Sequence, residues 1–242
     1  MAEQNERSIG SVERPLRSSF WNDIHNNLER RKSHMASVEK FTAHAVVNQL
    51  RHIERTIANP SNEDIDPARE NQNYSLAPDR GMSSYDYFKE RKAELYCYGR
   101  DDVKVMAGWI VTAPRDLPAD QHEAFFQSTH NFLIERYGEA NCIQSIVHND
   151  ESGQPHLHYC FIPAVPDKKH GGEKICANDV INPKELRNFH PDLQKHLKAD
   201  GINANIQSGI TKAQGGNRSV WEMKQERRQQ FEHDRTIERG RW

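Results

Sequence analysis

The sequence predicts an α+β fold in which a central antiparallel β-sheet is flanked by helices. Two observations carry this prediction. Strand-like apolar runs alternate along the chain with amphipathic segments of helical period, and two such runs, residues 142–148 and 156–165, are separated by a short polar segment. That spacing is typical of a β-hairpin, whose two strands are antiparallel.

The composition indicates a polar protein with one sizeable domain, or one domain and an appendage. The chain has 242 residues, of which 28% are charged, and its mean hydropathy is −0.94. The formal net charge of −2 argues against a histone-like DNA coat, so a nucleic-acid partner requires a local basic patch. The longest apolar run, residues 105–111, is too short to cross a bilayer, so we expect no membrane segment.

The cysteines and the N-terminal segment indicate a cytoplasmic location. The first residues lack the apolar core of a signal peptide. The cysteines form no CxxC pair and are typical of reduced residues in a cytosolic protein. They are Cys97, Cys142, Cys160 and Cys176.

The N-terminal third contains a polar extension, a strand and a helix. Residues 1–34 are polar and weakly patterned, and we place the working domain at residues 35–210. Alternation over residues 36–43 predicts the first strand. Residues 46–57 predict a short helix, with Val47, Leu50 and Ile57 on one side.

The middle of the chain begins with a long loop. Residues 58–81 contain three prolines and a glycine, and irregular segments of this length are often functional. Residues 83–96 predict a helix with a serine cap. Residues 104–114 predict a buried strand ended by proline, and residues 118–138 predict an amphipathic helix that begins at proline and ends at glycine.

The C-terminal part follows the predicted hairpin. Residues 182–201 predict a further helix. We interpret residues 211–242 as a linker and a charged helix. Because the helical pattern continues to Trp242, we expect a further C-terminal region that this chain lacks, which would serve homodimerisation or the binding of partners.

Three histidines gather at the hairpin. His156 and His158 share one face of their strand, because successive side chains alternate. His148 comes opposite His156 when the chain folds back, at about 5 Å between Cβ atoms. Three imidazoles so placed can ligate one divalent ion and leave open coordination positions. Asp150 and Glu151 are expected at the rim, where they orient a ligand or accept a proton.

A simpler interpretation is that the His-x-His pattern arises by chance on an exposed strand. The chain has 13 histidines, so such a coincidence is reasonable. The third histidine and the acidic pair, at a spacing that fits a hairpin, favour the metal site.

The segment HNDESGQPHLH (residues 148–158) resembles the HxDE…PHxH motif of Mob/Pre-type plasmid mobilisation relaxases, the MobV family of HUH endonucleases. RHIER (residues 51–55) resembles the family's upstream HxxR segment, and IDPARENQNYSL (residues 65–76) resembles its middle motif. The resemblance runs from Met35 to about Glu222 and implies a sandwich of two or three layers. The chain departs from the family's pattern in one place, because three residues separate Glu151 from Pro155 where familiar versions have two.

The resemblance implies a metal-dependent DNA-nicking site. His148, His156 and His158 would hold Mn²⁺ or Mg²⁺, and Glu151 would support them. The partner would be single-stranded or supercoiled plasmid DNA at the origin of transfer (oriT), in the bacterial cytoplasm.

The resemblance also implies that His52 attacks the scissile phosphate and forms a covalent 5′-phosphohistidine intermediate, from which the strand is later rejoined. A neutral imidazole, with an ordinary pKa of about 6.5, is nucleophilic at cellular pH without a strong base. Arg55 would orient the substrate or the nucleophile from the same helix face. From the residues alone, RHIER is more typical of a solvated helix face, and only the resemblance singles out His52. Tyr74, Tyr85 and Tyr87 are rival nucleophiles, because most HUH enzymes use tyrosine.

Basic and aromatic residues interleave between the first strand and the second helix. This mixture suits a single DNA strand, because cations follow phosphates and aromatic rings stack on bases. We expect DNA contacts at Arg51, Arg69, Asn73, Tyr74 and Arg80.

Two other functions fit the same residues. A metal-dependent phosphodiester hydrolase would use the ion to activate water, with Glu151 as the base. A non-catalytic DNA-binding module would bind the same DNA without nicking it.

Overall fold

The computed structural model describes residues 35–58, 62 and 64–206. All described residues belong to one compact unit of the chain. The predicted N-terminal extension and the predicted C-terminal linker and helix lie outside the described residues.

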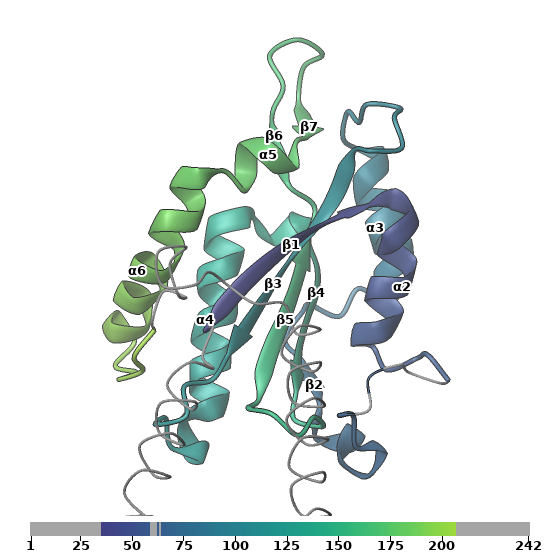
Figure 1. Ribbon diagram of the computed structural model, residues 1–242. Helices are drawn as coiled ribbons and strands as arrows, with labels where there is room; N and C mark the ends of the chain where they lie inside the picture. The colour runs from purple at the N-terminus through teal and green to yellow at the C-terminus, as the bar shows by residue number, and fades with distance from the viewer. Residues whose placement is uncertain (1–34, 59–61, 63, 207–242) are drawn as a thin grey trace, which may run out of the picture. The chain divides into compact units, whose positions relative to one another are not determined.

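A five-stranded antiparallel sheet forms the centre of this unit (Figure 1). Every neighbouring pair of its strands is antiparallel, as the sequence predicts. Across the sheet the strands are β1 (Ala36–Thr42), β3 (Lys104–Thr112), β5 (His156–Phe161), β4 (Cys142–His148) and β2 (Tyr74–Ser75).

One face of the sheet carries the larger core. Helices α4 (His122–Tyr137) and α6 (Pro183–Ala199) cover this face (Figure 1). The ring of Trp109 stacks on Phe189 of α6 with centroids 3.5 Å apart. Its indole Nε1 donates a hydrogen bond to the Tyr137 hydroxyl at 2.8 Å. Trp109 thus joins the sheet to both helices.

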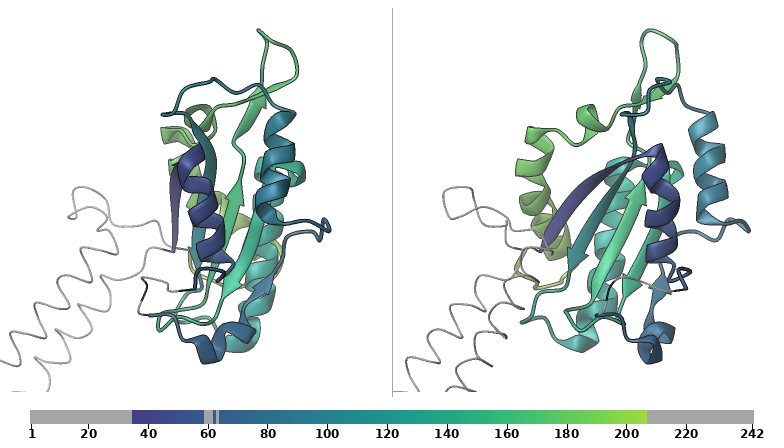
Figure 2. Two further views of the ribbon diagram at one scale, coloured as in Figure 1. Left: turned by 90° about the vertical axis from the view of Figure 1, so that its right-hand side faces the viewer. Right: turned by 45° about the vertical axis from the view of Figure 1, so that its right-hand side comes forward.

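The opposite face carries a second core beneath helices α2 (Ala43–Ile53) and α3 (Ser84–Ala93). Figure 2 shows both helices on this side of the sheet. The fold is therefore a three-layer sandwich, which confirms the predicted sheet with flanking helices and selects three layers over two. Cα partners in the sheet place His148 directly opposite His156, as predicted for the hairpin.

Helix α2 differs from its prediction. It begins at Ala43, as soon as β1 ends, and it ends at Ile53. Val46, Leu50 and Ile53 are its buried residues, so the predicted side with Val47 and Ile57 was wrong. The spacing of four and then three residues keeps the buried side chains on one stripe over the sheet.

The remaining elements lie mostly where the sequence predicts them. Ser83 caps α3 by accepting a hydrogen bond from the Asp86 N–H. The long loop contains a 3₁₀-helix, η1 (Pro67–Gln72), and the edge strand β2. Short elements complete the described chain: η2 (Ala119–Gln121), η3 (Glu139–Asn141), β6 (Ala164–Pro166), β7 (Glu173–Ile175) and α5 (Ala177–Val180). Within the described residues, no helix has the length and apolar character needed to cross a membrane.

Candidate metal centre

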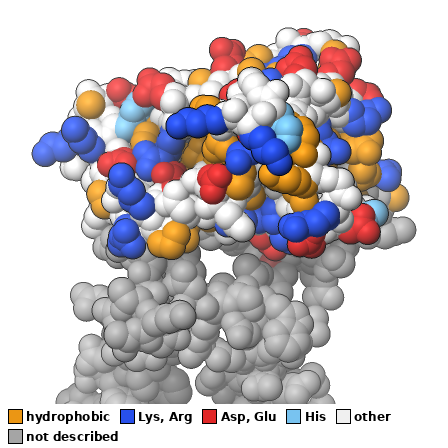
Figure 3. Space-filling view, turned by 90° about the horizontal axis from the view of Figure 1, so that it is seen from above, with side chains coloured by type: hydrophobic (Ala, Val, Ile, Leu, Met, Phe, Trp, Pro, Cys, Tyr) orange, Lys and Arg blue, Asp and Glu red, His pale blue; other side chains and the backbone are white. Residues whose placement is uncertain are grey.

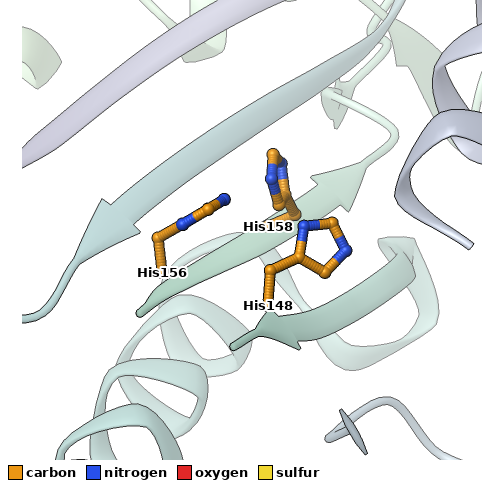
Figure 4. Close-up of side chains that lie close together, drawn as sticks. All are labelled: His148, His156 and His158. Atoms are coloured by element: carbon orange, nitrogen blue, oxygen red, sulfur yellow. The ribbon is translucent and has the colours of Figure 1, made fainter. Parts of the chain in front are cut away.

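Three imidazole rings meet at one end of the β4–β5 hairpin (Figure 4). The ring centroids are 4.6 Å apart for His148 and His158, 4.9 Å for His156 and His158, and 5.4 Å for His148 and His156. One nitrogen from each ring lies within 4.8 Å of the others, a grouping that could hold one metal ion. The predicted convergence of the three histidines is confirmed.

Hydrogen bonds determine which ring nitrogens keep a lone pair. His148 Nε2 lies 2.8 Å from the carbonyl of Ile53. Because a carbonyl only accepts, Nε2 carries the proton and Nδ1 keeps the lone pair. In the same way, His156 Nδ1 lies 3.1 Å from the Gln154 carbonyl, which leaves the lone pair on Nε2. A divalent ion binds a neutral ring through such a lone pair, and the lone pair of His148 faces Arg55 Nη2 at 3.0 Å.

Burial also keeps the rings unprotonated. Burial and the nearby Arg55 cation lower the pKa of His148 to about 4. Burial, followed by the neighbouring histidines, holds the pKa of His158 well below its ordinary value. At neutral pH these two imidazoles therefore need not release a proton before they bind a metal ion, and the three nitrogens can hold one divalent ion.

Arg55 joins helix α2 to the hairpin. Its Nε and Nη2 atoms donate to the two carboxylate oxygens of Asp150 at 2.7 and 2.8 Å. The same Nη2 lies 2.9 Å from Glu151 Oε1 and 3.0 Å from His148 Nδ1. The predicted position on a helix face was wrong, because α2 ends at Ile53 and Arg55 has a left-handed backbone with φ of 58°. This turn directs the guanidinium into the site rather than along the helix.

Asp150 is fully buried, so its predicted place at the rim was also wrong. Burial raises the pKa of its carboxyl, but hydrogen bonds from Arg55 and Asn73 outweigh this effect and lower the pKa to about 2. His148, Asp150 and Glu151 form a second possible metal cluster by their geometry, yet Arg55 already pairs with both carboxylates and offsets one of their two negative charges. Sequence reasoning missed this ion pair; the available signal was an isolated arginine three residues after His52 and an acidic pair beside His148.

Glu151 remains in the site despite the longer turn that follows it. Its backbone forms a β-bridge with Ile65. One carboxylate oxygen accepts from Arg55, and the other lies 4.0 Å from His156 Nε2. The side chain is 19% exposed, so solvent and a ligand can reach it.

His52 lies in the last turn of α2, next to the residue whose carbonyl binds His148. Its own carbonyl accepts a hydrogen bond from Arg55 Nη1 at 3.2 Å. Burial and then the Arg55 cation lower the pKa of the half-buried His52 ring. The charges of Glu151, Asp150 and His156 also act on this pKa, so His52 is within electrostatic reach of the three-histidine group.

The residues predicted to bind DNA lie in separate parts of the structure. Arg51 is exposed on α2. Arg69 donates to the carbonyls of Asn149 and Glu151 and braces the hairpin turn, while Asn73 Oδ1 accepts from the Asn149 N–H at 2.7 Å. Arg80 lies at the other end of β4, where it donates to the Glu139 carbonyl. Their contacts with DNA remain predictions.

The rival tyrosines lie away from the three histidines. Tyr74 pairs with Val147 and packs against the core on the opposite face of the sheet. The Tyr87 hydroxyl donates to the Ala140 carbonyl, just before β4 begins, whereas His148 ends that strand. The two ends of β4 are six residues, or about 20 Å, apart. Tyr85 lines a shallow depression beside Ala43, at the end of α2 opposite His52.

Residues 31–233 match the family model described as plasmid recombination enzyme, Mob_Pre. This chain belongs to the Mob_Pre family. The resemblance seen in the three sequence motifs is confirmed.

Members of the Mob_Pre family from several bacteria are similar to this chain. A plasmid recombination enzyme of Streptococcus agalactiae is 29% identical over 199 residues, which cover 78% of this chain and 38% of that protein. Its counterpart in Lactiplantibacillus plantarum is 30% identical over 198 residues, covering 78% of this chain and 52% of that protein. The chain thus spans about two-fifths to one half of the length of these curated relatives.

A solved structure of the same family shares the fold. The MobM relaxase domain, bound to plasmid pMV158 oriT DNA in a Mn-bound crystal structure at pH 6.8, has a TM-score of 0.65 and is 27% identical. The match covers 78% of this chain and 96% of the MobM chain.

Proposed function

We propose that this protein is a plasmid mobilisation relaxase that nicks one DNA strand at an origin of transfer and later rejoins it. The observation that carries the proposal is the position of His52, beside the three-histidine group, whereas Tyr74 faces the other side of the sheet and Tyr85 and Tyr87 lie away from the group. Membership of the Mob_Pre family and the likeness to a relaxase domain bound to oriT DNA support it.

The proposed centre holds its ion through His148, His156 and His158. A bound Mn²⁺ or Mg²⁺ would polarise the scissile phosphate and offset the negative charge that develops on it. Manganese is supported by the Mn-bound MobM relaxase domain. For His148 to ligate through Nδ1, Arg55 Nη2 must release that atom, and its bonds to Asp150 and Glu151 keep the guanidinium in place.

His52 is the proposed nucleophile. Because its pKa is lowered, the ring is largely neutral at cellular pH and needs no strong base. A ring nitrogen forms a bond to phosphorus, the bond from phosphorus to the 3′ oxygen breaks, and that oxygen takes up a proton. The 5′ end stays attached as a phosphohistidine, and attack by a 3′-hydroxyl reverses the step and rejoins the strand.

Arg55 and Glu151 are proposed to position these groups. Arg55 holds the His52 carbonyl and the hairpin carboxylates together, so the nucleophile and the metal ligands move as one unit. Glu151, between Arg55 and His156, would orient the ligand side of the centre. Arg51, Arg69, Asn73, Tyr74 and Arg80 remain the proposed DNA contacts.

The proposed setting is the bacterial cytoplasm, with plasmid DNA as the partner. The four cysteines are free, which fits a reducing compartment. Dimerisation through a further C-terminal region is also a proposal; the greater length of the curated relatives leaves room for one.

A trapped protein–DNA adduct tests the nucleophile. After incubation with Mn²⁺ and a single-stranded oligonucleotide carrying the origin, peptide mapping should find the 5′ phosphate on His52. The bond should be acid-labile and stable to mild alkali, as phosphorus–nitrogen bonds are. DNA attached to Tyr74, Tyr85 or Tyr87 would refute His52. Cleavage without any adduct would favour the hydrolase, and binding without cleavage would favour the non-catalytic module.

A further inference from the structure

A short β-ribbon projects from the end of the sheet opposite the three histidines. Strand β5 begins at His156, and the ribbon of β6 and β7 begins three residues after β5 ends. Figure 1 shows the ribbon beyond the upper end of the sheet, and both views of Figure 2 agree. Lys168 and Lys169 are exposed in its turn.

Several contacts hold the ribbon in place. The Tyr96 N–H donates to the Glu173 carbonyl at 3.0 Å, and the Ile175 N–H donates to the Tyr96 carbonyl at 2.9 Å, so this segment adds a third strand-like edge. Tyr96 also stacks on His170 with ring centroids 3.7 Å apart. Arg91 on α3 forms an ion pair with Glu173 at 2.7 Å. The ribbon is therefore anchored to the sandwich through α3 and the segment that follows it.

The turn itself is closed by Asp167. Its carboxylate accepts from the Lys169 N–H at 3.0 Å and pairs with His170 at 2.6 Å. Gly171 and Gly172 have positive φ angles of 79° and 68°, which complete the tight reversal. This geometry holds the backbone that carries the two lysines.

The ribbon, residues 164–175, contains three lysines and two acidic residues, a formal net charge of +1 with His170 neutral. Its two acidic residues, Asp167 and Glu173, are already engaged with His170 and Arg91. Lys168 and Lys169 form no ion pair with any other described residue. Seen from above, Lys and Arg side chains recur across this end of the molecule, with hydrophobic and acidic side chains between them (Figure 3).

We propose that the β6–β7 ribbon binds the phosphate backbone of duplex DNA that flanks the nicked segment. This inference rests on the proposed function, because it takes the same DNA as its partner. A two-stranded ribbon fits a duplex groove, and lysines bind phosphates without reading sequence. His170, the one ring in the turn of residues 167–172, is stacked on Tyr96, and the exposed ring of Tyr98 packs against Tyr96 rather than in the turn. The tip itself therefore offers charge rather than a platform for unpaired bases.

Chain length indicates where on the DNA the contact falls. Lys168 follows His158 by ten residues, so at about 3.3 Å per residue the two lie at most ~33 Å apart. At about 3.4 Å per base pair, this span corresponds to roughly ten base pairs. A duplex arm that starts near the metal centre and runs for about ten base pairs or more is therefore long enough to reach the ribbon.

The test measures DNA affinity against salt for two probes, a 30-base-pair duplex of mixed sequence and a 10-nucleotide single strand. The double variant Lys168→Ala/Lys169→Ala should bind the duplex roughly 5- to 50-fold more weakly at 0.1 M salt, and its log–log salt slope should fall by up to about 1.8. Its affinity for the short strand should not change. The matched control Lys195→Ala/Lys198→Ala removes two exposed lysines from α6 and should leave both affinities unchanged.

Equal weakening by both double variants would mean that only overall charge matters, and would overturn the ribbon contact. Unchanged duplex affinity in the ribbon variant would overturn it too. Circular dichroism confirms that the variants stay folded. The relaxase proposal is tested by a different measurement, the nicking of origin DNA by the wild type. If the wild type does not nick but the ribbon variant still loses duplex affinity, the ribbon contact is supported and the nicking activity is refuted.

Discussion

His148 is engaged at both ring nitrogens, by the Ile53 carbonyl and by Arg55. These two bonds connect a strand to the end of a helix that stands more than ninety positions earlier in the chain. The carbonyl that binds His148, a proposed metal ligand, belongs to Ile53, the residue directly after the proposed nucleophile His52. At this scale the site depends on single hydrogen bonds.

Changing either His156 or His158 to Ala should abolish Mn²⁺-dependent relaxation of supercoiled origin plasmid and weaken Mn²⁺ binding at least tenfold in calorimetry. Each change removes one of three nitrogen ligands. The control His44→Ala removes an imidazole that is 80% exposed and should alter neither property. Normal activity of both variants, or of the wild type in EDTA, would contradict the metal assignment.

Asp150→Asn should destabilise the protein by about 3 kcal/mol, because it leaves the buried Arg55 cation without its full partner. Urea unfolding in EDTA measures this free energy apart from any activity. Asp102→Asn is the matched control, since Asp102 pairs with Arg100 on the surface and such pairs contribute about 0–1 kcal/mol. A similar loss of unfolding free energy in the two variants would show that the buried ion pair contributes no more to stability than the surface pair.

The two helix layers have separate tasks. Helix α2 brings His52 and the Ile53 carbonyl to the hairpin, while α4 and α6 fill the opposite face. Trp109 and Phe189 join that second face through stacked rings. Damage to the α6 layer should therefore lower stability before it changes metal binding.

Phe189→Ala should lower the free energy of unfolding by about 3–5 kcal/mol, as expected for a fully buried aromatic ring. Leu186→Ala, on the same helix but 47% exposed, should cost no more than about 0.5 kcal/mol. Mn²⁺ affinity, measured at a temperature where both variants are folded, should stay at the wild-type value. A large loss of affinity in Phe189→Ala would show that α6 also supports the site.

At the scale of the whole molecule, stability without metal should fall as the pH falls from about 6.5 towards 4. The folded protein holds His148 and His158 neutral, with pKa values below that of an unfolded histidine. The unfolded chain therefore binds protons first, and stability is complete only above about pH 6.5. His148 alone would account for roughly 3 kcal/mol of this loss. Urea unfolding in EDTA at a series of pH values measures it, and a flat profile would contradict the buried neutral state.

Local pattern determined much of the fold. The strands, the helices and the hairpin turn follow from side-chain periods of 2 and 3.6 residues and from caps such as Ser83. The convergence of His148, His156 and His158 was predictable for the same reason, because a two-residue repeat and a short turn fix which side chains meet across a hairpin. The three sequence motifs were sufficient to recognise the family.

Tertiary structure decided what local periods do not encode. The buried pair of Arg55 and Asp150 joins residues 95 positions apart, and its geometry requires a helix that ends at Ile53 and a left-handed turn after it. The face of α2 that packs on the sheet, the placement of Tyr74 behind the sheet and the three layers likewise depend on long-range packing. Such contacts are selected by the free energy of burying apolar surface and pairing buried charge in the complete fold, so they appear only once all the layers are assembled.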